Sequence, residues 1–232
     1  AGISLAELLA KTKTYPVPEK KLAAVLKGIE KEFPEGIPAA GADGLRFTLA
    51  ALSAHGRDVK LSIPRAAGYK AFFNKIWNAT RFVLMRVGQA PAPSIDEVKD
   101  QLALGDRWIL SRLQRAVKAT SDAIDAYRFD EAANAIYQFF WTELCDVYVE
   151  VTKGAIDKPA TRATLLHALD TSLRLLHPFC PFQTEEIWQK LPGRDARWPS
   201  TKFCAVAPWP TPDLALVDEN AEREMAVVQD AV

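Results

Sequence analysis

Long apolar runs and cysteines are both scarce in this 232-residue chain. No stretch approaches the roughly eighteen consecutive apolar residues that a membrane-spanning helix needs, and the N-terminal residues lack the basic and apolar regions of a signal peptide. The three cysteines, Cys145, Cys180 and Cys204, are widely spaced and form no CxxC pair, which argues against a disulfide framework or a zinc site. We therefore expect a cytoplasmic chain with buried, reduced thiols, no membrane partner and no bound metal.

Catalytic motifs are scarce as well. No glycine-rich phosphate loop occurs, and His55, His167 and His177 show no spacing typical of a metal site or a catalytic triad. The adjacent Glu185 and Glu186 are typical of the acidic first turn of a helix rather than of a catalytic pair. The sequence predicts no catalytic residue and no cofactor site in this chain.

Acidic side chains are missing from one long stretch. The net charge is zero, but residues 60–118 carry eleven basic and four acidic side chains, whereas residues 119–232 carry ten and eighteen. No acidic residue lies between Asp58 and Asp96, where the basic residues are Lys60, Arg65, Lys70, Lys75, Arg81 and Arg86. Salt screens charges beyond roughly 8–10 Å, so a polyanion responds to such local charge rather than to the net charge. The alternative is that these residues pair with the acidic C-terminal half of the same fold.

Helical signals dominate the chain. Proline, glycine and capping patterns predict long helices at residues 64–87, 104–127, 130–153 and 158–177. Four such helices joined by short loops are typical of an antiparallel bundle. The fold class predicted is therefore mainly α.

Shorter elements flank this predicted bundle. Before it we expect a small helical or α+β module: helices near residues 4–12 and 18–33, a helix capped by Asp43, and an extended piece at RDVKLS. Leu45, Leu49 and Leu52 share one face of the third helix. After the bundle we expect a short helix at residues 184–188, a strand at KFCAVAPWP, and a truncated helix from Asp218.

The predicted helix at residues 64–87 has two different arcs. One arc is apolar and includes Trp77 among the residues expected in the core. The other carries a stripe of Lys70, Asn74, Asn78 and Arg81, flanked by Lys75, Phe82 and Arg86. Amides can address base edges, cations can neutralise phosphates, and an exposed ring can stack on an unpaired base, so the arc fits single-stranded RNA. The alternative is structural: the asparagines bond a neighbouring helix and Phe82 packs under the following linker.

Four segments resemble the bacterial valyl-tRNA synthetases closely and in order: DGLRFTLAALSAHGRD, GYKAFFNKIWNATRFVLM, YRFDEAANAIYQFFWTELCDVYVE and LHPFCPFQTEEIW. The runs NKIWNATRFVLM and FDEAANAIYQFFWTELCD are specific to the valyl enzyme among its class I relatives. The opening GISLAELL is similar to the segment that follows the family's KMSKS loop. The resemblance covers nearly the whole chain.

This resemblance implies a C-terminal portion of such an enzyme. Residues 1–63 correspond to the stem-contact region, residues 64–191 to the class Ia anticodon-binding bundle, and residues 192–232 to an extension that leads to a coiled coil. The catalytic and editing domains, which use ATP and Mg²⁺ in the full-length enzyme, would lie upstream. We expect an inactive, monomeric portion whose partner is tRNA-Val.

The resemblance also implies roles for individual residues. The residues expected to contact phosphates are Lys70, Lys75, Arg81 and Arg86. The residues expected to contact splayed bases are Asn74, Asn78 and Phe82. The stem-contact residues are Arg46, Arg57 and Lys60. In the related methionyl enzyme an asparagine and an arginine four residues later fall approximately on Asn74 and Asn78, so this chain has an amide at the second position. Two alternatives remain: the same region of an isoleucyl or leucyl enzyme, or a helical protein-interaction module with no RNA role.

Overall fold

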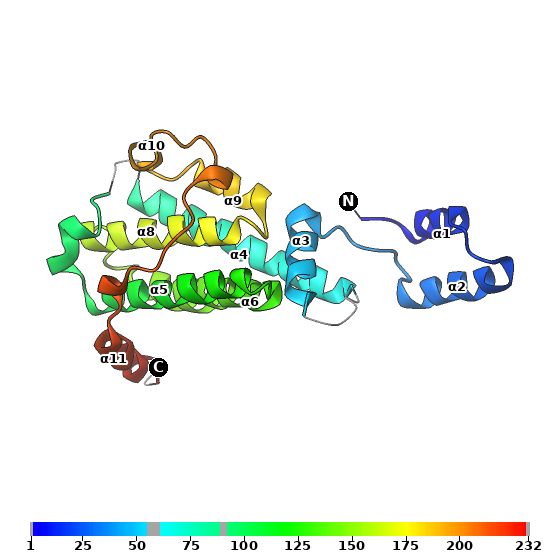
Figure 1. Cartoon of the computed structure of the whole chain (residues 1–232), viewed down its shortest axis with the longest axis horizontal. Helices are drawn as coiled ribbons and strands as arrows, with labels where there is room; N and C mark the ends of the chain where they lie inside the picture. Colours follow the sequence, from blue (N-terminus) through cyan, green and yellow to red (C-terminus); the bar gives the residue numbers. More distant parts are fainter. Residues whose placement is uncertain (1, 55–60, 89–91, 231–232) are drawn as a thin grey trace.

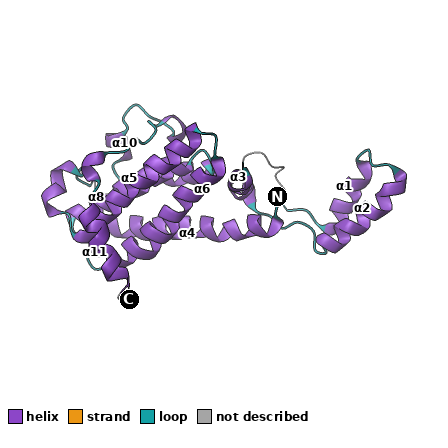
Figure 2. Cartoon of the chain, turned by 60° about the horizontal axis from the view of Figure 1, so that its bottom comes forward, coloured by secondary structure: helices purple, strands orange, loops and turns teal. Residues whose placement is uncertain are grey.

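The computed structural model describes residues 2–54, 61–88 and 92–230. Four helices form its body: α4 (Ile63–Val87), α5 (Leu104–Asp125), α6 (Phe129–Gln138) and α8 (Pro159–Leu176). Helices α5, α6 and α8 run alongside one another and α4 runs obliquely to them (Figures 1 and 2), and α8 contacts each of the other three. The mainly α fold and the long helices expected from the sequence are confirmed.

The predicted helix at residues 130–153 forms as one continuous unit. After α6 the chain continues as a π-helical segment, η2 (Phe139–Tyr148), and then as α7 (Val149–Val151). The wider winding of η2 brings Phe139, Phe140 and Tyr148 into the core, where each is at most 2% exposed. The Tyr148 hydroxyl donates to the buried Asp106 carboxylate of α5 at 2.5 Å, so the one polar group of this ring is satisfied.

Shorter elements surround the body. Their bounds are α1 (Leu5–Thr14), α2 (Glu19–Glu32), α3 (Gly41–Leu52), η1 (Asp96–Gln101), α9 (Pro181–Trp188), α10 (Arg194–Arg197), η3 (Cys204–Val206), η4 (Leu214–Leu216) and α11 (Glu219–Asp230). The α1–α2 hairpin stands apart from the body in both views (Figures 1 and 2), and neither helix has a buried residue. Ser4 and Glu7 form a capping box that starts α1. None of the helices in the described ranges is long and apolar enough to cross a membrane.

The prediction of a strand at KFCAVAPWP is wrong. This segment forms the single 3-10 turn η3 followed by irregular chain. Side chains satisfy its backbone in place of a neighbouring strand: the Cys204 amide donates to the Glu185 carboxylate at 2.9 Å, and Arg174 donates to the Pro208 carbonyl at 2.7 Å.

Of the two forms expected for the N-terminal module, helical or α+β, the structure has the helical one. Its described residues hold one isolated antiparallel bridge, between Ile3 and Ile37, and no strand. Most of the extended piece expected at RDVKLS lies outside the described residues. The Ser62 side chain at its end caps α4 by accepting from the Arg65 amide.

The predicted apolar face of α3 is partly solvent-facing. Leu45 and Leu49 are 42% and 43% exposed, whereas Phe47 is 1% exposed. The Phe47 ring lies 4.8 Å from the ring of Tyr69, centroid to centroid, in an aromatic cluster that fixes the orientation of α3. Asp43 does not cap α3, which begins at Gly41; its carboxylate instead accepts from the Gln183 amide at 2.8 Å, in the first turn of α9.

Candidate nucleic-acid interface

Helix α4 places the predicted RNA-binding residues on the surface of the bundle. Its buried face holds Ala66, Phe72, Ile76, Thr80, Val83 and Val87. Lys70, Asn74, Asn78 and Arg81 are all exposed on the opposite side. Because side chains three and four residues apart lie on one helix face, these four form a single continuous stripe, as predicted.

The stripe residues make no side-chain hydrogen bond or ion pair within residues 2–54, 61–88 and 92–230. The structural alternative for the asparagines, a bond to a neighbouring helix, is therefore not seen among these residues. An exposed amide or guanidinium that stabilises no internal contact keeps its hydrogen-bonding capacity for a ligand. The stripe has the chemistry of a polar recognition surface.

At the edge of this stripe next to η2, side chains already contact other parts of the protein. The Lys75 ammonium forms an ion pair with Asp146 and lies 5.1 Å from the centroid of the Trp141 ring. Phe82 is half-buried against the core, and two cations lie near its ring: Arg86 at 5.7 Å and Lys153 at 6.0 Å from the centroid. Of the predicted contacts on this edge, Arg86 is exposed, whereas Lys75 and Phe82 already have intramolecular partners.

The other edge, next to α9, differs from the prediction. Trp77, expected in the core, is 40% exposed, and the Lys190 ammonium lies 5.5 Å from the centroid of its ring. Met85, one turn beyond Arg81, is 67% exposed. Helical periodicity placed Trp77 in the apolar arc, but the position of α9 decides which part of that arc is covered, and Trp77 is left partly open. Trp77 and Met85 are the exposed residues of this surface that the sequence reasoning missed.

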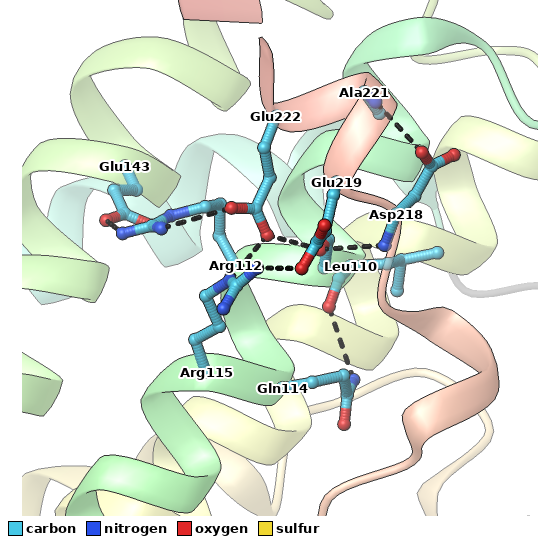
Figure 3. A network of polar contacts seen from close by, with 10 residues as sticks. Leu110, Arg112, Gln114, Arg115, Glu143, Asp218, Glu219, Ala221 and Glu222 are labelled. Carbon is cyan, nitrogen blue, oxygen red and sulfur yellow. Dashed lines mark hydrogen bonds and ion pairs between the residues drawn. The ribbon is translucent and has the colours of Figure 1, made fainter.

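The arginines of α5, unlike the cations of the stripe, form ion pairs within the protein. Arg112 forms two hydrogen bonds to the Glu143 carboxylate, at 2.9 and 2.7 Å, and lies 3.6 Å from Glu222. Arg115 donates to Glu222 at 2.7 Å, and Arg107 pairs with Asp218 at the same distance. Figure 3 shows Arg112 between Glu143 and Glu222, with Arg115 directed at Glu222 and Glu219. The acidic C-terminal residues therefore neutralise α5, and the pairing expected as an alternative for the whole basic region holds for α5.

The predicted stem-contact residues are only partly described. Arg46, on α3, is exposed and donates to the Pro178 carbonyl at 2.9 Å, which ties α3 to the turn between α8 and α9. Arg57 and Lys60 lie outside the described residues, as does His55.

The thiols are buried, as predicted. Cys145, Cys180 and Cys204 are free, and burial raises the pKa of Cys145 and of Cys204 to about 12. At neutral pH such thiols are protonated and poorly reactive. Across the described ranges, no group of three or more histidine, cysteine, aspartate or glutamate side chains is placed to hold a metal ion.

An exposed stripe of amides and cations on one long helix of a bundle is a surface with the chemistry to bind single-stranded RNA. The family described as the anticodon-binding domain of tRNA ligase matches residues 106–232, more than half of the chain, and the chain belongs to this family. Over its whole length it is similar to valine–tRNA ligases, which confirms the resemblance found in the sequence. The enzyme of Laribacter hongkongensis is 43% identical over 238 residues, which are 100% of this chain and 25% of that protein. The enzyme of Fervidobacterium nodosum is 48% identical over 186 residues, which are 79% of this chain and 20% of that protein.

The matched stretches thus span about a fifth to a quarter of the length of these relatives. Helix α4 precedes the range that the family matches but lies within the stretch shared with the Laribacter enzyme. Among solved structures, a LeuRS–tRNA–LeuAMS ternary complex from Agrobacterium radiobacter K84 matches 83% of this chain and 21% of its own, with a TM-score of 0.58 and 22% identity. That likeness supports the fold.

Proposed function

We propose that this chain is the part of a valine–tRNA ligase that binds the anticodon arm of tRNA-Val. In the complete enzyme this grip would orient the acceptor end of the tRNA toward the catalytic domain, where ATP and Mg²⁺ serve the ligation of valine. We further propose that the enzyme acts as a monomer in the cytoplasm, and that residues 1–63 contact the tRNA stem.

The observation that carries this proposal is the contrast between the basic residues of α4 and those of α5. Lys70 and Arg81 have no acidic partner among the described residues, whereas Arg107, Arg112 and Arg115 are paired with carboxylates. Unpaired cations gain most from a polyanion, because phosphate contacts release the counterions condensed on RNA. The stripe of α4 is the surface where such contacts cost no internal ion pair.

The asparagines of the stripe supply the other requirement, a means of reading bases. Asn74 and Asn78 each present a donor and an acceptor that can address the edge of an unpaired base. Phosphate contacts position an RNA and base contacts specify it, so cations and amides on one face combine both tasks. We assign Lys70, Arg81 and Arg86 to phosphates and Asn74 and Asn78 to bases.

An isoleucyl or leucyl enzyme would have the same architecture. The relatives described above favour the valine enzyme, since they are 43% and 48% identical whereas the leucyl structure is 22% identical. The test is a filter-binding titration of the 232-residue chain at low and at physiological salt. It compares a tRNA-Val transcript with the same transcript carrying a swapped anticodon and with isoleucine and leucine tRNAs. Tighter, salt-sensitive binding of the native anticodon supports the proposal. Salt-insensitive binding, or tighter binding of an isoleucine or leucine tRNA, would contradict it.

A further inference from the structure

A small groove lies between α4 and α9, on the edge of the stripe that carries Trp77. It has a volume of about 260 Å³ and is lined mainly by apolar side chains of both helices. Pockets for drug-sized ligands usually measure about 300–1,000 Å³. The groove is therefore of a size for one planar ring system and not for a helix or an extended peptide.

The lining of the groove combines an aromatic face with positive charge. Trp77 and Met85 are 40% and 67% exposed, and Ile187 of α9 provides a buried apolar wall. Arg81, which belongs to both the stripe and the groove, has no partner within the described part of the chain. Lys190 is exposed at the rim and is held by Glu186 and by the Trp77 ring. A flat aromatic surface bordered by two cations complements a base attached to a phosphate.

A second, independent observation concerns Thr80. Its side chain is 2% exposed and contributes to the wall of the groove. Among the described residues its hydroxyl oxygen has no hydrogen-bond partner. A buried hydroxyl without a partner costs free energy, and a ligand whose polar edge reached this oxygen would remove that cost.

We propose that this groove holds one unpaired nucleobase of the anticodon loop, stacked on Trp77, with the adjoining phosphate on Arg81. The inference rests on the proposed function, because it names the place on α4 where a base of that RNA sits. It assigns the stacking role to Trp77 in place of Phe82, whose ring packs against the core beside two cations. The groove and the stripe would then contact the same stretch of RNA, since Arg81 belongs to both.

The test uses the 232-residue chain and an anticodon stem–loop RNA with 2-aminopurine at successive unpaired positions. Stacking on an aromatic ring quenches 2-aminopurine, so one position should lose fluorescence when the wild-type chain binds. Trp77→Ala should abolish this quenching and weaken binding about tenfold, the usual scale for loss of one stacked base. Trp77→Phe should keep part of both, because a smaller ring still offers a stacking face.

Two control variants keep the result interpretable. Phe182→Ala removes a ring that is 66% exposed on the same helix α9 but does not line the groove, and it should change neither quenching nor affinity. Phe82→Ala should leave the quenching in place. Circular dichroism of each variant shows whether the helices are retained.

The outcomes separate the two proposals. If the wild-type chain binds the stem–loop and quenching survives in Trp77→Ala, the groove assignment is overturned while the proposed function stands. If quenching is lost in Phe82→Ala and not in Trp77→Ala, the base lies on the η2 edge and the groove assignment is again overturned. If the wild-type chain does not bind the RNA, both proposals fail.

Discussion

Helices α4 and α5 are neighbours in the sequence, and both carry basic side chains, yet the fold uses them differently. The arginines of α5 face η2 and α11, where Glu143 and Glu222 meet them (Figure 3). The stripe of α4 faces solvent, and its cations have no such partner among the described residues. The arginines of α5 hold the C-terminal helix α11 against the bundle, whereas the cations of the α4 stripe are free to bind a ligand.

This difference shows that charge in a sequence does not by itself identify a binding surface. Residues 60–118 carry eleven basic and four acidic side chains, but three of the basic residues, Arg107, Arg112 and Arg115, form ion pairs with the acidic C-terminal segment. Partly exposed ion pairs contribute modestly to stability because solvent screens them. Their main consequence is that the charge of α5 is neutralised, so that the exposed stripe of α4 keeps its positive charge.

The largest effect on stability should come from Arg112→Ala. This change removes a two-bond contact to Glu143 and a weaker ion pair with Glu222, which keeps Arg115 as its partner. We expect a loss of about 1–3 kcal/mol in the free energy of unfolding, measured by urea titration. Arg81→Ala serves as the matched arginine variant and should stay within about 0.5 kcal/mol of wild type. Equal destabilisation by both would erase the contrast between α4 and α5.

The reverse pattern is expected for RNA binding. Arg81→Ala should weaken binding of all tRNAs about tenfold at low salt, because it removes a charge-assisted phosphate contact. It should also reduce the slope of log affinity against log salt by about one. Filter binding over a salt series measures both quantities. An unchanged salt slope would show that Arg81 does not contact phosphate.

Asn78→Ala should act on preference rather than on affinity in general. Loss of a neutral hydrogen bond to a base edge is worth about 0.5–1.5 kcal/mol, which is a few-fold in the ratio of affinities for native and swapped anticodons. The ratio is measured by competition between the two transcripts. If Asn78→Ala and Arg81→Ala lose preference and affinity alike, the division of labour between amides and cations is wrong.

Acid should loosen the α5–α11 contact before it unfolds the body. A backbone hydrogen bond from Ala221 lowers the pKa of Asp218; partial burial raises the pKa of Glu222, but hydrogen bonds from Arg115 and Ser111 hold it below its ordinary value. Carboxylates with lowered pKa values stabilise the fold above their unfolded pKa, about 4, and this contribution is lost as the pH falls through the folded pKa. The protection of the α11 amides against hydrogen exchange, taken relative to the intrinsic rate at each pH, should therefore fall below about pH 4 before that of α8. A simultaneous fall in both helices would contradict this order.

The smallest effect is expected from Asp146→Asn. This variant frees Lys75 from its ion pair and removes one negative charge beside the stripe. We expect RNA binding to strengthen about twofold, on the scale of an exposed ion pair. Lys75→Gln should have little effect in the wild-type background and a larger one in Asp146→Asn. A double-mutant cycle in the binding assay tests this coupling, and additive effects would show that Lys75 is not restrained by Asp146.

Local signals in the sequence were enough to predict the long helices of the body. Ser4, Pro64 and Asp218 mark helix starts that the structure reproduces, because capping and proline geometry act within one turn. The stripe of Lys70, Asn74, Asn78 and Arg81 followed from helical periodicity alone, and the structure exposes all four.

Contacts between distant segments decided the rest. The strand expected at KFCAVAPWP was replaced by irregular chain because Glu185 and Arg174, far from it in sequence, bond its backbone. The exposed side of α3 was misjudged because the aromatic cluster around Phe47 comes from α4 and α6.

The sequence by itself determined the class of fold, the family and the arc of α4 that faces outward. Only the tertiary structure decided which cations in the basic region are free, and that Trp77 borders a groove rather than the core. The physical reason is that periodicity is a property of one helix, whereas burial and ion pairing depend on which other helix lies against it. Helix α9 leaves Trp77 partly open, and α11 neutralises α5.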